Sequence, residues 1–315
     1  MALHSDDLTP SSPTTLRATG SVARRQAVSR LSRYVLLAAT LSGVAVLVYL
    51  GYETIAKGWD RLSWGFLTSY PSRFAERAGL RSSILGSAWI LGTTVILAIP
   101  IAIGTAVWIE EFAPRNKLLT IVKLNLANLA GVPSIIYGIL GLAVFVRLMG
   151  LGPSILAGAL TLTLMILPMT VIASQEAIRQ VPPSIREGAL ALGATRWQTV
   201  RHHVIPGAMP GIMTGMILAV SRAAGETAAL IMIGAFTFIS FDNTGLSPTN
   251  SPPFVTPPPL GDDFTTVPVQ IYNWTIRPQE AFRENAAAAI IVLMVAILSL
   301  NLVAAVIRER FRRHD

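Results

Sequence analysis

Long apolar runs alternate with short polar segments from about Tyr34 onwards. A helix needs about 20 apolar residues to cross the hydrocarbon core of a bilayer, and several runs reach that length. They predict membrane-spanning helices at Tyr34–Tyr52, Ser87–Trp108, Leu118–Phe145, Ser154–Ala173, Met209–Leu230 and Ala286–Ile307. In the third run the crossing is expected somewhere inside the interval. The pattern therefore indicates an all-α polytopic membrane protein with six spans.

The polar segments and the basic residues predict the orientation of the chain. Lys and Arg resist translocation, and most of the 25 lie on the inner side if both termini are cytoplasmic. We then expect a disordered basic tail at 1–33, a transmembrane domain at 34–307 and a basic cytoplasmic tail at 308–315. The polar segment Val181–Pro206 becomes a cytoplasmic excursion, and Phe241–Glu284 becomes a long external loop.

The external loop divides into two parts of different character. Its first part contains the stretch "SPTNSPPFVTPPPL", whose prolines prevent a regular helix or ladder, so it is expected to be extended. Its second part, "TTVPVQIYNWTIRPQEAF", has β-branched and aromatic side chains that we expect to pack against other elements.

Composition agrees with a chain embedded in lipid and removes several functional classes. Of the 315 residues, 52% are hydrophobic and 13% are charged, and the mean hydropathy is +0.56, unlike an ordinary soluble domain. The net charge of +8 flanks the apolar runs and does not indicate nucleic-acid binding. The sequence has no cysteine, no zinc motif among its four histidines and no phosphate-binding loop motif. We therefore expect no enzyme activity, no cofactor and no metal, and any ATP to be bound by a separate subunit.

Capping residues predict a short helix in the first half of the cytoplasmic excursion. Ser184 followed by Glu187 fits a capping box, in which a hydroxyl and a carboxylate satisfy free amides at a helix start. Gly193 can end that helix, because glycine readily adopts the left-handed conformation of a helix terminus.

A second short helix is predicted to follow directly. Thr195 and Gln198 fit another capping box, and the helix is expected to run to about Val204, where Pro206 closes it. The excursion would then hold two coupling helices over 184–204, joined by a Gly-Ala kink. Helices this short are marginal in water without a docking partner. The pair therefore either binds another protein or caps the inner face of its own bundle.

Small residues recur every four positions along the fifth predicted span, at Gly211, Gly215, Ala219 and Ala223. This spacing lets helix backbones approach closely in lipid. We expect this face to meet another helix of the same bundle, with a dimer interface as the alternative.

The fifth span also contains a charged pair, Arg222 and Glu226, inside an apolar run. A spacing of four residues places both on one helix face, and Gly225 between them can break or kink the helix. An arginine at mid-bilayer costs about 2.5–3.5 kcal/mol on insertion scales, so it usually serves a pathway or a partner. A guanidinium offers paired donors suited to an oxyanion. Two interpretations follow: the pair lines a substrate path, or the two charges neutralise each other.

Other polar residues of the predicted spans carry less information. Asn125, Asn128, Ser134 and Tyr137 could line a path, but in lipid such groups more often bond to neighbouring helices, and we favour that interpretation. Lys123 is expected to snorkel from its helix end to the headgroups.

The segment "EGALALGATRWQTVRHHVIP" resembles the EAA loop of the permeases of binding-protein-dependent ABC importers. The residues that match the family pattern are Glu187, Ala189, Gly193 and Pro206. Gly188 replaces the first alanine of the pattern. The resemblance implies that this loop couples the chain to a separate ATPase, with Glu187 to Gly193 as the contact.

Three further segments extend the likeness from about Leu85 to the C-terminus: "GVPSIIYGILG", "AVSRAAGETAALIMIGA" and "TTVPVQIYNWTIRPQEAF". They resemble the PstA family, the A-type permease subunits of phosphate-specific ABC importers. The resemblance implies the type I (MetI-like) permease architecture in the inner membrane and a phosphate path that includes Arg222 and Glu226. The partners that it implies are a C-type permease subunit, two copies of an ATPase subunit and a periplasmic phosphate-binding protein.

Three other functions remain open at this point. A permease for another oxyanion, such as sulfate or molybdate, would share the same loop. An ion-coupled secondary transporter could use Arg222 and Glu226 as a relay, and its uptake would survive loss of the ATPase. A membrane scaffold or signalling protein would show no solute dependence.

Overall fold

The protein is described by a computed structural model that covers residues 20–235, 239 and 260–312. Across these ranges the chain is helical, with no β-strand and with an isolated bridge between Ser154 and Asp263. The chain divides into two units, Met1–Glu53 and Thr54–Asp315, which are described separately below as unit 1 and unit 2.

Unit 1 contributes most of α1 (Gly20–Gly58), the helix that carries the first predicted span. Its apolar side chains are exposed along the helix, as Leu36 and Leu47 illustrate, which suits a surface covered by lipid or by another chain. The helix begins at Gly20, so the predicted disordered tail at 1–33 is wrong for its last part. The apolar pattern reaches into the basic segment, and this continues the helix beyond the hydrophobic run.

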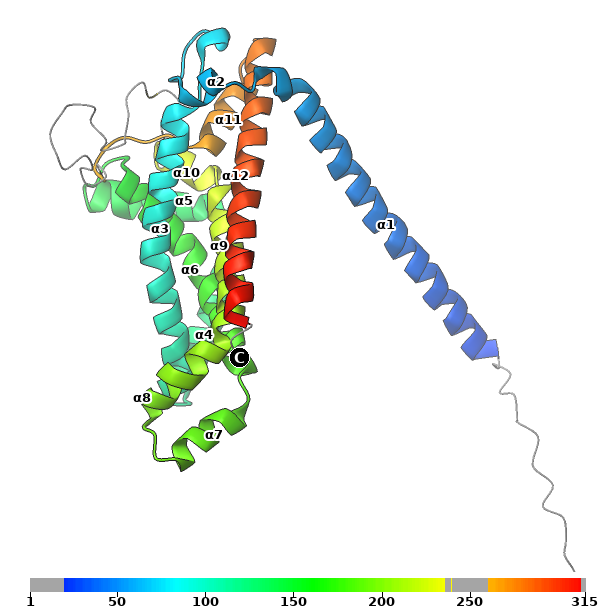
Figure 1. The fold of residues 1–315 in the computed structure, drawn as a ribbon, viewed down its shortest axis with the longest axis vertical. Coiled ribbons are helices and arrows are strands. Elements are labelled where there is room, and N and C mark those ends of the chain that lie inside the picture. Colours follow the sequence, from blue (N-terminus) through cyan, green and yellow to red (C-terminus); the bar gives the residue numbers. More distant parts are fainter. Residues whose placement is uncertain (1–19, 236–238, 240–259, 313–315) are drawn as a thin grey trace, which may run out of the picture. The chain divides into compact units, whose positions relative to one another are not determined.

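The longer helices of unit 2 lie roughly along one axis (Figure 1). In chain order the helices are α2 (Trp64–Thr68), α3 (Arg81–Val107), α4 (Lys117–Ala130), α5 (Ser134–Gly141), α6 (Ile155–Gln180), α7 (Pro183–Ala191), α8 (Arg196–Thr199), α9 (Ile205–Ala224), α10 (Ala228–Met232), α11 (Val267–Thr275) and α12 (Glu280–Arg312). Short 3-10 turns lie at Trp59–Arg61 and Ala75–Arg77, and π-helical turns at Trp108–Phe112, Leu142–Leu148 and Val200–Val204. We call the first and last π turns η3 and η5.

The structure has long apolar helices at five of the six predicted spans and a bent helix pair at the other one, with shifted boundaries. Among the described residues, five helices are long and apolar enough to cross a membrane: Arg24–Arg61, Arg81–Phe112, Ile155–Gln180, Arg196–Ala224 and Glu280–Arg310. The third predicted span, Leu118–Phe145, corresponds to a bent pair, Lys117–Ala130 with Ser134–Leu148, which makes the sixth if the pair is one span.

The third span is broken by 103° between α4 and α5. Gly131 ends α4, and Pro133 precedes α5. A residue before proline is driven out of the helical region, so Val132 cannot continue α4. Residues 131–133 therefore turn the chain sharply within an otherwise apolar run.

The fifth span differs from the prediction at both ends. Pro206 does not close a separate helix, because α8, η5 and α9 form one continuous helical stretch, with Pro206 in the first turn of α9. Since Pro206 has no amide hydrogen, the carbonyl four residues earlier lacks its usual partner, and the helix passes through a π turn instead of ending. At the other end, α9 stops at Ala224 and does not reach Leu230. Gly225 is the terminal residue, which confirms the predicted break.

The predicted stripe of small residues on α9 packs against α6 of the same chain. A Cβ added at Gly211 would lie 2.7 Å from Ala177 Cβ, and one added at Gly215 would lie 2.5 Å from Ala173 Cβ. Ala219 is also buried. The packing interpretation is therefore confirmed, since only glycine allows this approach at Gly211 and Gly215.

The end of unit 2 that carries α2 and α11 has its own apolar cluster. Phe66, Leu80, Trp274 and Phe282 are buried together there, which confirms that the second part of the external loop packs against other elements. Most of the proline-rich stretch lies outside the described residues. The last helix, α12, continues to Arg312, so the predicted tail at 308–315 begins as helix.

Candidate functional site

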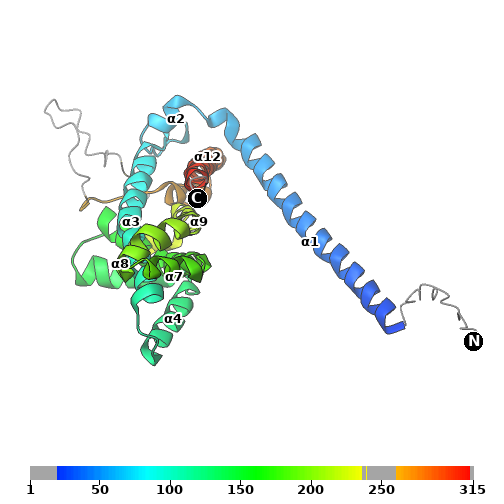
Figure 2. The same cartoon turned by 60° about the horizontal axis from the view of Figure 1, so that its bottom comes forward.

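The elbow, Pro183–Val204, lies across the end of unit 2 opposite to α2 and α11 (Figure 1). Figure 2 brings this end forward and shows α7 and α8 oriented across the long helices. Its first helix begins at Pro183, and no side chain caps it, so the predicted Ser184–Glu187 capping box is wrong. Proline at the first position has a preset φ and needs no hydrogen-bond acceptor, so it starts the helix without a side-chain cap.

Gly193 ends α7 as predicted. Its φ is +85°, in the left-handed region. The Gly193 amide donates to the Leu190 carbonyl at 3.0 Å, and the Ala194 amide donates to the Ala189 carbonyl at 3.1 Å. These paired bonds form a Schellman motif, which satisfies free carbonyls at the helix end and turns the chain toward α8.

The second predicted capping box is present at the start of α8. The Thr195 amide donates to Gln198 Oε1 at 2.8 Å, and the Gln198 amide donates to Thr195 Oγ1 at 3.3 Å. Both bonds satisfy amides that a helix start leaves free.

The residues predicted to contact an ATPase divide between two helices. Glu187 and Gly188 are exposed on α7, whereas Ala189 faces inward, and Gly193 is exposed at the tip of the elbow. Pro206 belongs to α9. The elbow also exposes large apolar side chains, namely Ile185, Leu190, Leu192 and Trp197, with Leu192 91% exposed.

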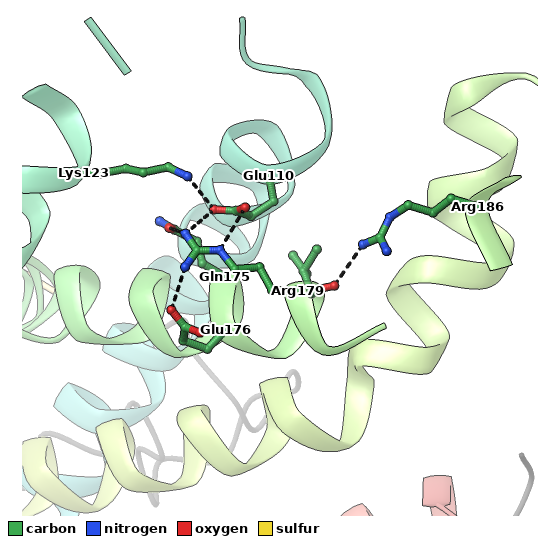
Figure 3. A network of polar contacts seen from close by, with 7 residues as sticks. Glu110, Lys123, Gln175, Glu176, Arg179 and Arg186 are labelled. Carbon is green, nitrogen blue, oxygen red and sulfur yellow. Dashed lines mark hydrogen bonds and ion pairs between the residues drawn. The ribbon is translucent and has the colours of Figure 1, made fainter. Parts of the chain in front are cut away.

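Behind the elbow, Glu110 of η3 joins three helical elements (Figure 3). Its Oε1 lies 2.9 Å from Lys123 Nζ of α4 and 2.8 Å from Arg179 Nη2 of α6. Arg179 also pairs with Glu176 at 2.8 Å. The Glu110 side chain is 12% exposed. The prediction that Lys123 snorkels to the headgroups is therefore corrected: the amine is held by a carboxylate of its own bundle.

The neighbouring acid, Glu111, pairs with the elbow. Arg186 of α7 donates to Glu111 Oε1 from Nη2 at 2.7 Å and from Nε at 3.0 Å. The same guanidinium donates to the Val181 carbonyl at 2.7 Å and to the Ile178 carbonyl at 2.9 Å. These carbonyls lie at the C-terminal end of α6, where a helix leaves acceptors unsatisfied. Arg186 thus ties α7 to η3 and to α6.

The second helix of the elbow, α8, contacts η3 through aromatic side chains, as the first helix, α7, does through Arg186. We call the two helices the arms of the elbow. The rings of Phe112 and Trp197 lie 6.2 Å apart between centroids, at 43°. The Arg196 guanidinium lies 5.4 Å from the centroid of the Phe112 ring. Both arms of the elbow are therefore attached to the same short turn at the end of α3.

Glu110 and Glu111 were not among the residues predicted from the sequence to have a function. A signal was present, because the two acids are adjacent at the end of a long apolar run, in "WIEEF". Ionisable residues at such positions are expensive and usually have a partner or a function. What the sequence did not contain was the identity of their partners, which come from α4, α6 and α7.

Arg222 and Glu226 do not lie on one helix face. Arg222 is in the last turn of α9, and Glu226 follows the helix end at Gly225. Glu226 Oε1 accepts a bond from the Ala229 amide at 3.2 Å and so caps α10. In the described part of the chain, no ion pair joins Arg222 to Glu226 or to another carboxylate. Arg222 Nη1 lies 3.8 Å from Met169 Sδ of α6.

The remaining polar candidates give mixed outcomes. The Tyr137 hydroxyl donates to the Leu129 carbonyl at 2.8 Å and joins α5 to α4, as the favoured interpretation predicted. Asn125 instead donates to the Ile121 carbonyl of its own helix. Roles for Asn128 and Ser134 stay predictions. Over the described ranges, no group of three His, Asp or Glu side chains could hold a metal ion.

Comparison with known sequences decides the family. Residues 63–313 match the family described as binding-protein-dependent transport system inner membrane component. The chain belongs to this family. It is an ABC importer permease subunit and a multi-pass protein of the inner membrane. In such systems the ATPase is a separate subunit.

Two curated relatives and one solved structure are similar to this permease over most of its length. It is 36% identical over 266 residues to the probable ABC transporter permease protein YqgI of Bacillus subtilis (strain 168), covering 82% of this chain and 88% of that protein. It is 30% identical over 269 residues to the phosphate transport system permease protein PstA 1 of Mycobacterium tuberculosis (strain CDC 1551 / Oshkosh), covering 83% and 82%. A crystal structure of a bacterial ABC transporter involved in the import of the acidic polysaccharide alginate matches with a TM-score of 0.61 at 17% identity, over 90% of this chain and 99% of that chain. The structural likeness confirms the predicted type I permease fold.

Proposed function

We propose that this permease carries inorganic phosphate across the inner membrane. It would form the path together with a C-type permease subunit, receive phosphate from a periplasmic binding protein and take its drive from two copies of a cytoplasmic ATPase. The similarity to PstA 1 supports phosphate as the solute. The observation that carries the proposal is the state of Arg222, an exposed arginine at a helix break without a carboxylate partner among the described residues.

An uncompensated guanidinium in an apolar bundle is a binding group for an anion. Insertion of such a charge costs about 2.5–3.5 kcal/mol, and a partner carboxylate would reduce this penalty. Among the described residues Arg222 lacks that partner, and Met169 Sδ, 3.8 Å from its Nη1, is only a weak acceptor. Its donors therefore remain open to a passing oxyanion, which a planar guanidinium can bind through two oxygens.

Glu226 also supports the helix that follows the break. By accepting the Ala229 amide, it stabilises the start of α10 directly after the break. It thereby fixes the end of α9 and the position of Arg222 without neutralising it. The C-terminal carbonyls of α9 favour a positive charge at that end and help to retain the arginine there.

The elbow supplies the contact with the ATPase. Leu190 and Leu192 are exposed apolar side chains next to the exposed Glu187. A cleft in a partner protein would bury the two leucines and satisfy the carboxylate. Binding of ATP would close the two ATPase subunits and move the elbow. The attached helices would then open the path to Arg222 from one side of the membrane at a time.

Uptake in cells lacking this chain tests the solute and the energy source together. Re-introduction of the wild-type gene should restore radiolabelled phosphate uptake, which unlabelled phosphate should compete away and sulfate or molybdate should not. Depletion of the ATPase should abolish uptake. Competition by sulfate or molybdate would assign another oxyanion, and uptake that survives ATPase depletion but not an uncoupler would contradict the ABC mechanism.

Cross-linking tests the elbow. Because the chain has no cysteine, Leu192→Cys introduces a unique thiol at a 91% exposed position. A thiol-to-amine cross-linker should join this residue to the ATPase subunit in membranes. The matched control, Ile96→Cys, is 72% exposed on α3 and should give no ATPase adduct. Equal adducts from both positions would remove the elbow as the specific contact.

A further inference from the structure

Arg186 stands at the root of the elbow, directly before Glu187, and nothing in the coupling pattern accounts for it. Its guanidinium makes four hydrogen bonds, two to the Glu111 carboxylate and two to carbonyls of the last turn of α6 and the residue that follows it. The Glu111 side chain is 9% exposed and the Arg186 side chain 24%. The pair is therefore a largely buried joint between α7, the end of α3 and the end of α6.

We propose that Glu111 and Arg186 are positioning residues for coupling: they transmit movement of α7 to the inner ends of α3 and α6. The inference rests on the proposed contact between the elbow and an ATPase. With the joint intact, α7 and these helix ends move as one body when the ATPase closes. Without it, the ATPase can move α7 alone and hydrolyse ATP without opening the path.

The geometry favours transmission over simple anchoring. An arginine that binds a carboxylate and two carbonyls through one planar guanidinium resists both rotation and sliding, because each displacement breaks several directed bonds. The apolar contacts that surround the joint, which involve Val181, Val200 and Val204, are non-directional and permit sliding. A rigid link from a partner-bound helix to the spans therefore depends on the ion pair.

The energetics of burial point the same way. A buried ion pair is usually no more stabilising than apolar residues of the same volume, because desolvation offsets the attraction. Stability alone therefore does not explain two charges at this position. A fixed geometry between α7 and η3 does, and the aromatic contact of Trp197 with Phe112 supports the other arm of the elbow in the same orientation.

The test uses the complete transporter in proteoliposomes with the conservative variants Glu111→Gln and Arg186→Lys. The first variant keeps a hydrogen-bond acceptor for Arg186, and the second keeps the positive charge beside Glu111, so both complexes should assemble. We expect the phosphate taken up per ATP hydrolysed to fall at least about fivefold in each. The matched control is Arg201→Lys, which makes the same change at an exposed elbow position and should keep the wild-type ratio.

A distance measurement reports on the joint independently of the solute. Spin labels at Ser184→Cys and Ile101→Cys mark α7 and α3, and both positions are exposed. In the wild-type background the distance should stay the same on ATP binding, because the two sites move together. In the Glu111→Gln and Arg186→Lys backgrounds it should change and broaden.

The outcomes separate this inference from the proposed function. The proposed function would be rejected if Leu192→Cys gave no cross-link to the ATPase subunit, or if the wild-type transporter took up no phosphate. An intact cross-link with a wild-type coupling ratio and an unchanged label distance in both variants would overturn the joint. The joint would also be overturned if the variants assembled poorly, lost ATPase activity and uptake in the same proportion, and kept the wild-type label distance. That result would mean that the ion pair contributes only to stability.

Discussion

The elbow end of unit 2 and the surroundings of Arg222 both hold charges in an apolar bundle, but they differ in how these charges are compensated. At the elbow end, Glu110 and Glu111 each bind basic side chains from other helices. At the break in α9, Arg222 faces a methionine sulfur, and Glu226 is turned to an amide instead. Compensated charges hold helices together, whereas an uncompensated charge remains available to a ligand.

The difference also appears in the helices themselves. The acids of η3 lie in a π-helical turn that redirects neighbouring side chains toward different helices, Glu110 to α4 and α6 and Glu111 to α7. Arg222 lies in the last turn of α9, which ends at Gly225, and its side chain is exposed. In the first region the irregular backbone directs side chains to neighbouring helices. In the second region it leaves a charged side chain exposed.

Of three graded comparisons, the largest effect is expected from giving Arg222 a carboxylate partner, which it lacks among the described residues. Met169→Glu places a carboxylate within reach of the guanidinium, which lies 3.8 Å from the present sulfur. A charge-assisted hydrogen bond of about 1.5–3 kcal/mol would then compete with the anion, so phosphate uptake should fall at least about tenfold. Met169→Gln adds polarity without charge and should reduce uptake much less. Equal uptake in the two variants would show that Arg222 does not bind the solute.

An intermediate effect is expected from removing a charge at the elbow end. Glu110→Gln leaves Lys123 and Arg179 without their shared carboxylate and should destabilise the isolated complex by about 1–3 kcal/mol, seen as a lower Tm in detergent. The control Glu176→Gln breaks an exposed pair with the same arginine and should change Tm little. Solute selectivity should be the same in both. A change of solute selectivity in Glu110→Gln would show that the charges of the elbow end also act on the solute, which would contradict the distinction between the two regions.

The smallest effect is expected from the glycines of the elbow, Gly188 inside α7 and Gly193 just after its end. Gly193→Ala puts a side chain on a left-handed residue and should cost about 1–2 kcal/mol, with weaker recovery of the ATPase on purification. Gly188→Ala lies inside the helix with open space around it and should stabilise α7 by about 0.5–1 kcal/mol. Opposite signs are therefore predicted for the same substitution five residues apart. The same sign at both positions would contradict the described elbow.

The number of spans and the packing face of α9 could be predicted from the sequence because both depend on local composition. Apolar length decides whether a segment can cross a bilayer, and a four-residue repeat such as Gly211 to Gly215 decides which face can approach a neighbour. The Thr195 capping box was predictable for the same reason, since its two partners are three residues apart. Roles for Arg222 and the other site residues remain proposals.

The interactions that the sequence did not predict are those between distant segments. Glu111 and Arg186 are 75 residues apart, and nothing local marks them as a pair. The absence of an Arg222–Glu226 pair was missed for a related reason: spacing of four implies one face only while the helix continues, and Gly225 ends it. Pro206 was predicted to end a helix, but the helix continues past it by way of a π turn.

Phosphate uptake into proteoliposomes that contain the complete transporter with Arg222→Gln, measured together with ATP hydrolysis in the same vesicles, tests the central claim most directly. Arg222, which has no carboxylate partner among the described residues, is predicted to bind the solute. The elbow end, whose charges are paired, is predicted to couple the chain to ATP hydrolysis. Uptake should therefore disappear while binding-protein-stimulated hydrolysis continues. Wild-type uptake in the variant, with an assembled complex, would contradict the account.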